Sequence, residues 1–217
     1  MEFGAIEFVD NPDPRCAVVL ILDTSASMAG QKIRDLNSGL ESFIADLKKD
    51  PYARQRVELS VITCGRQAAV VSDFVAVGTI DGYTPLQADG PTPMGAAINL
   101  AIDRLESRKT LYRENGIQYF RPWIVIMTDG MPTDDMKSAV TRIHESRNKG
   151  KSVVFCIGIG EDANMAELEK LSDRVKRLQE TRFAELFAWL SASLGQVSRS
   201  HMGDQVPLTS TESWEYI

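Results

Sequence analysis

The sequence contains few cysteines, and its first residues do not resemble a secretory leader. Its 217 residues include three cysteines, an odd number that does not suit the paired framework of a disulfide-stabilised domain. Cys16, Cys64 and Cys156 each lie in or beside an apolar run, where a free thiol acts as a small hydrophobic side chain. The first residues show no basic segment followed by an apolar one, as a secretory signal would. We therefore expect a protein of a reducing compartment, the cytoplasm.

Long apolar runs and an excess of basic residues are also missing. No run approaches the roughly 18 residues that a membrane-spanning helix needs, which argues against a membrane protein. Acidic residues outnumber basic ones by 30 to 24, which gives a formal net charge of -6. Nucleic-acid binding depends on clustered Lys and Arg, so this balance argues against a nucleic-acid partner. The small basic group within residues 142–151 is better explained as a solvated helix face.

What the sequence does contain is a regular alternation of apolar runs and amphipathic stretches. Strand-like runs cover residues 17–22, 57–63, 68–77, 123–127, 153–157 and, at a sheet edge, 175–178. Apolar residues at helical spacing cover residues 32–48, 95–115, 136–143, 165–171 and 183–197. Strands that alternate with helices predict a parallel sheet, because a parallel strand can be reached only through a crossover connection.

The runs at 57–63 and 68–77 are the exception to this alternation. Only four residues separate them, too few for a crossover helix, so we predict an antiparallel hairpin. The expected fold is an α/β domain, with a Rossmann-like open, mostly parallel sheet, one antiparallel edge strand and helices on both faces. We assign residues 1–13 to an N-terminal extension, 14–198 to the domain and 199–217 to a C-terminal tail.

Oxygen-bearing side chains gather at one edge of the predicted sheet. In open α/β sheets functional sites lie at the carboxyl ends of the strands, so the residues just after each strand are the informative ones. The carboxylates and hydroxyls that would meet there belong to Asp23, Ser25, Ser27, Thr92 and Asp129. Hard divalent cations prefer such oxygens, and Mg²⁺ takes six at about 2.0–2.1 Å. The two histidines lie elsewhere, which disfavours zinc and copper. We therefore predict a Mg²⁺ site, with Mn²⁺ or Ca²⁺ as alternatives.

Each of these residues also has a simpler structural interpretation. A serine of the first group could cap the following helix, and Thr92 could cap the next one. The Asp129-Gly130 pair is common in turns. Asp134 and Asp135 fit the first turn of the third helix, where the dipole favours negative charge, better than a supporting ligand role. The combination argues for a site, because three separate clusters all fall at the expected sheet edge.

The five residues in this order resemble the metal-ion-dependent adhesion site of von Willebrand factor type A (VWA) domains. The resemblance covers roughly residues 14–198, essentially the whole predicted domain. Within that family, three stretches are similar to the bacterial, cytoplasmic TerY group of tellurium-resistance proteins: residues 23–28, 92–95 and 128–134. The resemblance implies a VWA fold and a non-catalytic, metal-dependent protein-binding function. It also implies a role in a bacterial stress response or in tellurite resistance.

The resemblance further implies a role for each position. The hydroxyls of Ser25 and Ser27 would bind the cation directly. Asp23 and Asp129 would bind it directly or through water. Thr92 would move in or out of the coordination shell, and one position would stay open for an Asp or Glu carboxylate of a partner protein. In the TerY setting that partner would be a co-encoded protein kinase or PP2C-type phosphatase, and site hydroxyls would be candidates for phosphorylation.

Two other interpretations remain open. A Mg²⁺-dependent phosphotransfer enzyme could use Asp23 as its nucleophile, but such an enzyme usually positions a Lys on the phosphate. Lys32, the nearest lysine to the first loop, is better explained as exposed helix surface. The phosphate-binding G-x-x-x-x-G-K-[ST] pattern is absent from the sequence. The last interpretation is a structural interaction domain in which the metal site is vestigial.

Overall fold

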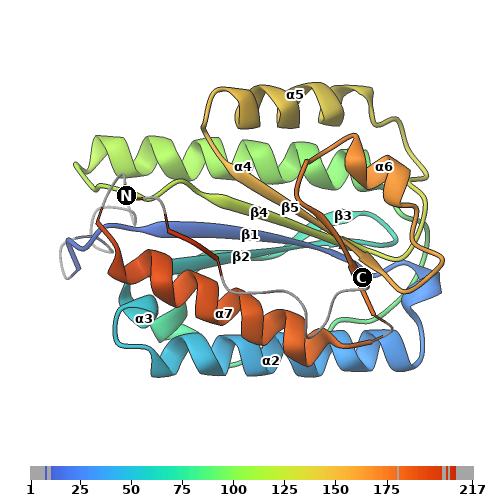
Figure 1. Ribbon diagram of the computed structural model, residues 1–217, viewed down its shortest axis with the longest axis horizontal. Helices are drawn as coiled ribbons and strands as arrows, with labels where there is room; N and C mark the ends of the chain where they lie inside the picture. The colour runs from blue at the N-terminus through green and yellow to red at the C-terminus, as the bar shows by residue number, and fades with distance from the viewer. Residues whose placement is uncertain (1–7, 9–10, 180, 202–203, 205, 209–217) are drawn as a thin grey trace.

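A computed structural model of the chain describes Phe8 and residues 11–179, 181–201, 204 and 206–208. This described part contains a six-stranded sheet with helices on both faces (Figure 1). The strands are β1 (Cys16–Asp23), β2 (Val57–Cys64), β3 (Ala68–Ala76), β4 (Trp123–Thr128), β5 (Val153–Ile159) and β6 (Val175–Leu178). β1 and β4 are buried at every position, as expected of central strands covered on both faces.

The strand order places β1 in the middle of the sheet, in the arrangement β3-β2-β1-β4-β5-β6. β1 pairs in parallel with both β2 and β4, and the β4–β5 and β5–β6 pairs are parallel as well. β3 pairs antiparallel with β2 at the sheet edge, as the short connection predicted. The chain thus leaves β1 toward one edge and returns to β4 on the other side. The loops after β1 and β4 therefore become neighbours at the carboxyl edge of the sheet.

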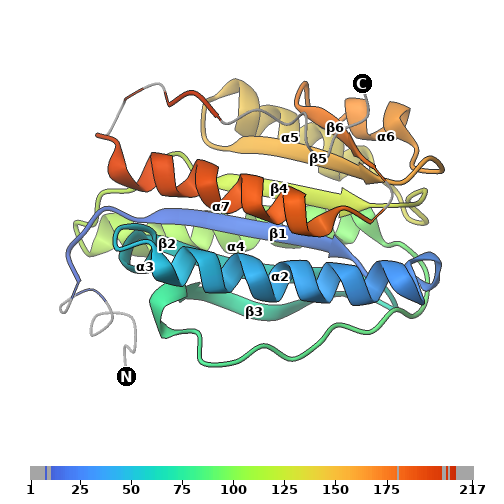
Figure 2. The same ribbon diagram turned by 60° about the horizontal axis from the view of Figure 1, so that its bottom comes forward.

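The helices form one layer on each face. They are α2 (Gln31–Lys49), α3 (Ala53–Arg56), α4 (Met94–Glu114), α5 (Lys137–Asn148), α6 (Met165–Glu169) and α7 (Phe183–Arg199). α2 and α7 lie side by side on one face, whereas α4, α5 and α6 lie on the other (Figures 1 and 2). This arrangement confirms the predicted α/β fold with an open, mostly parallel sheet.

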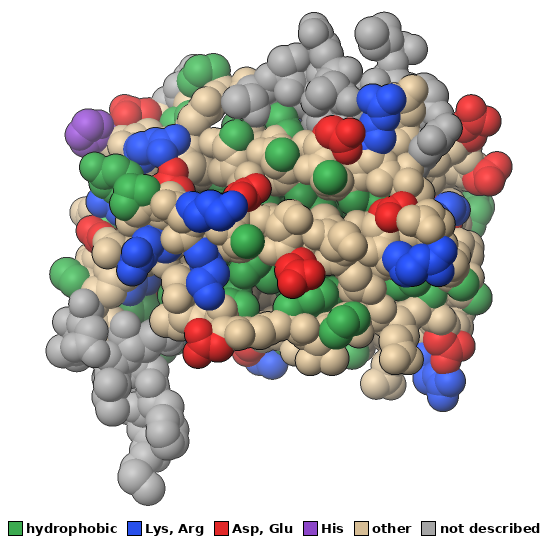
Figure 3. All heavy atoms as spheres, turned by 90° about the horizontal axis from the view of Figure 1, so that it is seen from below, with side chains coloured by type: hydrophobic (Ala, Val, Ile, Leu, Met, Phe, Trp, Pro, Cys, Tyr) green, Lys and Arg blue, Asp and Glu red, His purple; other side chains and the backbone are tan. Residues whose placement is uncertain are grey.

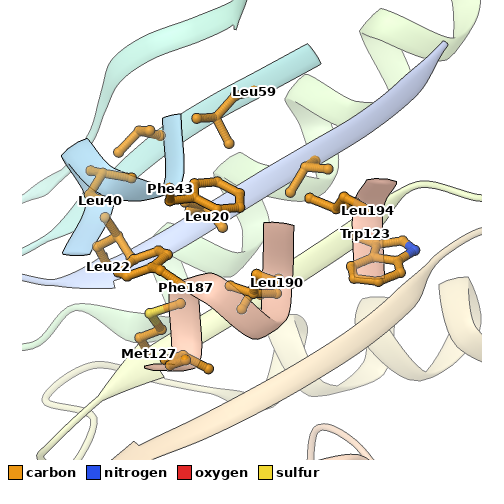
Figure 4. Close-up of a cluster of buried hydrophobic side chains, with 14 of the residues drawn as sticks. Leu20, Leu22, Leu40, Phe43, Leu59, Trp123, Met127, Phe187, Leu190 and Leu194 are labelled. Carbon is orange, nitrogen blue, oxygen red and sulfur yellow. The ribbon is translucent and has the colours of Figure 1, made fainter. Parts of the chain in front are cut away.

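The core between the sheet and the α2–α7 layer fixes the position of α2. Leu20 and Leu22 of β1 point toward Leu40 and Phe43 of α2 and toward Phe187 of α7 (Figure 4). The Phe43 and Phe187 rings pack with their centres 5.3 Å apart. Burying a Leu or Phe side chain fully contributes about 1.5–3 kcal/mol, so this layer is strongly held. The loop between β1 and α2 is consequently anchored at both of its ends.

The outer surfaces carry charges of both signs. On the face formed by α2 and α7, basic and acidic side chains are interspersed, and hydrophobic side chains show as small separate areas (Figure 3). On the other face, Arg142 of α5 contacts Asp103 at 2.5 Å, and Lys149, which directly follows α5, contacts Glu145. Within the described ranges, no helix is both long and apolar enough to cross a bilayer.

At the amino ends of the strands, a buried ion-pair group lies between the sheet and the Phe8 ring. Glu58 of β2 is fully buried and accepts hydrogen bonds from Arg15 Nε at 2.9 Å, Arg108 Nε at 2.7 Å and the Tyr112 hydroxyl. The Phe8 ring centre lies 5.5 Å from the Arg15 guanidinium carbon and 5.2 Å from that of Arg108. We refer to Glu58, Arg15, Arg108 and Tyr112 as the Glu58 cluster.

The predicted extension, 1–13, and the predicted tail, 199–217, lie largely outside the described residues. The described parts of both contact the domain. Phe8 packs on the Glu58 cluster, and Leu208 packs, partly buried, against the core on the α2–α7 side. Near the end of α7, Arg56 donates a hydrogen bond from Nη1 to the Ser198 carbonyl at 2.7 Å.

Candidate metal centre

Three loops meet at the carboxyl edge of the sheet and are tied together by backbone hydrogen bonds. The first loop follows β1 and bonds to the segment before α4, through Asp89 N–H to Thr24 O at 2.8 Å and Ala26 N–H to Gly90 O at 2.9 Å. That segment bonds in turn to the loop after β4, because Thr133 N–H donates to Thr92 O at 2.9 Å. The fold thus brings together the three segments that the sequence analysis singled out.

The hydroxyl and carboxylate side chains of the first and third loops form a continuous chain of contacts. The Ser25 and Ser27 hydroxyl oxygens lie 2.9 Å apart, and the Ser27 hydroxyl donates to Asp129 Oδ1 at 2.6 Å. Asp23 Oδ1 accepts the Ser25 backbone N–H at 2.8 Å, and Asp23 Oδ2 accepts the Thr128 hydroxyl. Four of the five predicted site residues therefore converge through direct hydrogen bonds.

Thr92 completes the group from the second loop. A Cβ built on Gly130 would lie 3.8 Å from the Ser27 Oγ and 3.8 Å from the Thr92 Oγ1, so both hydroxyls border the same small space above Gly130. Thr92 is almost fully buried, and its backbone N–H donates to the Thr133 hydroxyl at 3.1 Å. All five predicted residues are thus brought together at one edge.

The electrostatics of the site fit a cation. Burial raises the pKa of the Asp23 carboxyl because its charged form loses hydration, and the nearby Asp129 charge raises it further. Hydrogen bonds from Ser25 and Thr128 lower the pKa and partly offset the effect of burial. A divalent ion would stabilise the charged form of both acids. Within the described part of the chain, no three His, Cys, Asp or Glu side chains come together as a metal-binding group. Hydroxyl oxygens would have to supply the remaining ligands, which suits a hard cation such as Mg²⁺.

The alternative helix-capping roles of these hydroxyls are wrong. α2 has Gly30 at its N-cap, with a φ of 83° that favours glycine, and no side chain caps it there. α4 begins at Met94 with Pro93 at the N-cap position, and it too lacks a side-chain cap from that residue. Ser25, Ser27 and Thr92 are therefore free of the capping role that would have explained them locally.

Neither Asp134 nor Asp135 lies in the first turn of its own helix, but Asp135, two residues before that helix, does stabilise its N-terminus, because its Oδ1 accepts the Lys137 backbone N–H at 3.0 Å. α5 begins at Lys137, with no acidic residue in its first turn. Asp134 instead accepts the backbone N–H groups of Gly95 at 2.9 Å and Ala96 at 2.8 Å. It therefore caps the N-terminus of α4, a different helix, and holds the second loop against the third. The spacing of residues in the sequence does not predict this cap, because Asp134 and Gly95 are 39 residues apart.

The prediction that Lys32 is exposed helix surface is wrong as well. Its Nζ lies 2.5 Å from Asp129 Oδ2, and the side chain is 31% exposed. Side chains of a helix lean toward its N-terminus, and Lys32 is the second residue of α2, whose N-terminus adjoins the site. The N-terminal lean of helical side chains could therefore have predicted that Lys32 reaches the site. Thr128, the last residue of β4, was also missed; it directly precedes Asp129, and its hydroxyl bonds to Asp23.

Comparison with known proteins identifies relatives of this arrangement. The chain is 29% identical to human inter-alpha-trypsin inhibitor heavy chain H4 over 161 residues, which is 71% of this chain and 17% of that protein. It thus spans about a sixth of the length of such curated relatives. Among solved structures, a von Willebrand factor type A protein from Catenulispora acidiphila superposes with a TM-score of 0.61 at 21% identity, over 84% of this chain and 43% of that one.

A manganese-loaded TRAP protein from Plasmodium vivax is similar in fold as well. It superposes with a TM-score of 0.53 at 17% identity, over 79% of this chain and 71% of its own. The family model of the von Willebrand factor type A domain matches residues 17–186, which is most of the sequence. Domains of this family are often metal-dependent modules for protein interaction. The chain belongs to the von Willebrand factor type A family.

Proposed function

We propose that the chain is a non-catalytic, metal-dependent protein-binding module. Asp23, Ser25, Ser27, Thr92 and Asp129 would hold one divalent cation at the carboxyl edge of the sheet. Mg²⁺ is the expected ion because every donor is a hard oxygen, with Mn²⁺ and Ca²⁺ as alternatives. The observation that carries the proposal is the chain of contacts that links the two serine hydroxyls to Asp129 at 2.6–2.9 Å.

The partner would supply a carboxylate. Asp23 and Asp129 formally balance the charge of a dication, but with the three hydroxyls they supply only five of the six oxygens that Mg²⁺ prefers. An Asp or Glu of another protein can provide the sixth oxygen ligand through a charged, strongly bound carboxylate. Met131, which is 56% exposed on the loop after β4, would give that partner an apolar contact beside the site.

The biological setting is the narrower part of the proposal. The TerY-like stretches suggest a cytoplasmic protein of a bacterial stress or tellurite-resistance system. In that setting a co-encoded protein kinase or PP2C-type phosphatase is the expected partner. The curated relatives named above are mammalian, and they neither favour nor oppose this assignment.

A phosphotransfer enzyme that uses Asp23 is the competing function, and Lys32 supplies the lysine that such an enzyme needs near the phosphate. Asp23 itself argues against it. The side chain is fully buried, and each of its oxygens already accepts a hydrogen bond. A nucleophile must present an oxygen directly to the substrate, whereas an acid of a metal site can act on the cation through a bound water. Turnover of a phosphoester with Mg²⁺, lost in Asp23→Ala, would overturn the binding proposal.

The direct test is calorimetric titration of the purified protein with MgCl₂ and with MnCl₂. We expect binding in the wild type and in Asp46→Ala, whose exposed carboxylate on α2 pairs with Lys49 away from the site. We expect no binding in Asp129→Ala. At a hundred times its dissociation constant, the ion should add about 2.7 kcal/mol to the free energy of unfolding. Absence of heat in the wild type, with a melting temperature unchanged by EDTA, would support the structural, metal-free interpretation instead.

Partner capture tests the second half of the proposal. Extract passed over the immobilised protein in Mg²⁺ should yield proteins that are released by EDTA and not retained by Asp129→Ala. A partner whose captured region lacks an essential Asp or Glu would contradict recognition through a carboxylate.

A further inference from the structure

Lys32 places a positive charge on one of the two acids of the candidate metal centre. Its Nζ lies 2.5 Å from Asp129 Oδ2, while Asp129 Oδ1 accepts the Ser27 hydroxyl at 2.6 Å. The Asp129 side chain is 1% exposed. Both oxygens of this carboxylate are therefore engaged, one by a proposed metal ligand and the other by an ammonium group of the same chain.

The position of Lys32 follows from how α2 begins. A short 3-10 turn (Ala26–Met28) and Gly30 bring the chain from the first loop into the helix. The start of α2 therefore lies next to the site. The lysine stem then runs back toward the loops, since helical side chains lean toward the N-terminus.

The contact differs from the other cation–acid pair at this edge. Arg66 pairs with Asp89, but both side chains are largely exposed, so water competes with that pair. Asp129, by contrast, is buried and belongs to the predicted ligand set. A dication that uses Asp129 would meet the Lys32 ammonium within a few ångströms. Like charges at that separation repel strongly in a partly buried site.

We propose that Lys32 is the resident cation of this site, and that a divalent ion and the Lys32 ammonium exchange with each other on Asp129. This inference rests on the proposed function. Without metal, the ammonium neutralises Asp129 and keeps α2 joined to the loop after β4. When a divalent ion takes Asp129, the ammonium leaves for the solvent that its side chain already contacts.

Lysine suits this role better than arginine would. Its ammonium is a compact, strongly hydrated charge on a flexible stem, so it can leave a carboxylate and be stabilised by water. A guanidinium would bind the carboxylate through a rigid, two-pronged contact and would be harder to displace. The exchange therefore sets how tightly the site binds metal, and it keeps the loops assembled when metal is scarce.

The first experiment measures metal affinity and stability in Lys32→Met, which keeps an apolar stem of similar length. We expect Mn²⁺ and Mg²⁺ to bind about tenfold more tightly, because no ammonium has to be displaced. The metal-free protein should melt at a lower temperature than the wild type, whereas the metal-saturated proteins should melt alike. Lys49→Met is the matched control, since its exposed pair with Asp46 lies on the same helix and should leave both quantities unchanged.

The second experiment follows the lysine itself. Brief acetylation of the wild-type protein, read by mass spectrometry, should label Lys32 several times faster with saturating Mg²⁺ than with EDTA. Lys49 should be labelled equally in both. Metal binding that depends on Asp129, combined with unchanged Lys32 labelling and wild-type affinity in Lys32→Met, would overturn the exchange and leave the metal site intact. Absence of metal binding in both the wild type and Lys32→Met would overturn the metal site and the exchange together.

Discussion

The two ends of the sheet each bury acidic side chains, but they neutralise them in opposite ways. At the amino end, Glu58 is held by two guanidinium groups and a phenol. At the carboxyl end, Asp23 and Asp129 are held by hydroxyls, a backbone N–H and one lysine. Arginine partners are always charged and bind rigidly, so the Glu58 cluster is a permanent fastening. Hydroxyls and an ammonium can be reoriented or displaced, as the proposed exchange with a divalent cation at the other end requires.

The largest expected effect comes from removing the acid at the permanent end. Glu58→Ala leaves two buried guanidinium groups facing each other and should lower the free energy of unfolding by about 3–5 kcal/mol, measured by urea denaturation. Asp129→Asn in metal-free buffer should cost less than about 1 kcal/mol, because Lys32 returns to solvent. Arg15→Met, which leaves Glu58 two of its partners, should fall between them. Equal losses in Glu58→Ala and Asp129→Asn would remove the distinction between the two ends.

A smaller effect is expected where the second and third loops touch. A Cβ on Gly95 would lie 2.5 Å from the Asp135 carbonyl oxygen and 3.2 Å from Asp134 Oδ2. Gly95→Ala must therefore push the loops apart, at a cost of about 1–3 kcal/mol in unfolding free energy, and should weaken metal binding as well. Gly82→Ala is the control, because a Cβ there meets nothing within 4 Å. Unaltered metal affinity in Gly95→Ala would mean that the contact between the loops does not support the site.

The smallest expected difference is in the thiol reactivity of Cys16, which lies near Glu58, and of Cys64, which lies near Asp23. Burial, with Glu58 nearby, raises the pKa of Cys16 to about 12, and burial, with Asp23 nearby, raises that of Cys64 as well. At pH 8 a Cys16 thiol would be ionised in only about one molecule in ten thousand, against roughly a quarter for free cysteine. We expect almost no reaction of either thiol with Ellman's reagent until the protein is unfolded in guanidinium chloride.

The direction of the Cys16 pKa shift also defines the pH range over which this thiol affects the free energy of unfolding. Because the folded-state pKa of Cys16 is raised above the unfolded value, its contribution to stability is complete below about pH 8.5 and is lost as the pH approaches 12. Rapid modification of Cys64 but not Cys16 in the native protein at pH 8 would show that the carboxyl end opens locally while the amino end stays closed.

The fold could be predicted from the sequence because strand and helix signals are local. The unbroken β-branched run at 17–22 and the short connection after residue 63 were enough to place a buried central strand and an antiparallel hairpin. The convergence of Asp23 and Asp129 followed from one rule, that the carboxyl ends of parallel strands share an edge. The order of strands and helices is enough to predict that these two residues lie near each other.

The contacts of Asp134 and Lys32 could not be predicted in the same way. Asp134 caps a helix through Gly95, which lies 39 residues before it, and Lys32 contacts an acid 97 residues after it. Each contact depends on a side-chain direction and a loop geometry that no spacing encodes. The local alternatives, a helix dipole for Asp134 and a solvated surface for Lys32, were reasonable by frequency. They were wrong because tertiary contacts offered each charge a better partner.

The cap that Asp134 places on α4 has a consequence for signalling along the molecule. Asp134 joins the first turn of α4 to the loop after β4, and Thr92 lies two residues before that helix, so we expect a displacement of either loop to reach α4. About 20 Å and 26 Å further along the same helix lie Arg108 and Tyr112, which donate hydrogen bonds to Glu58. A ligand that displaces the loops at the carboxyl edge of the sheet would therefore shift the Glu58 cluster at the amino end, where Arg15 and Phe8 lie.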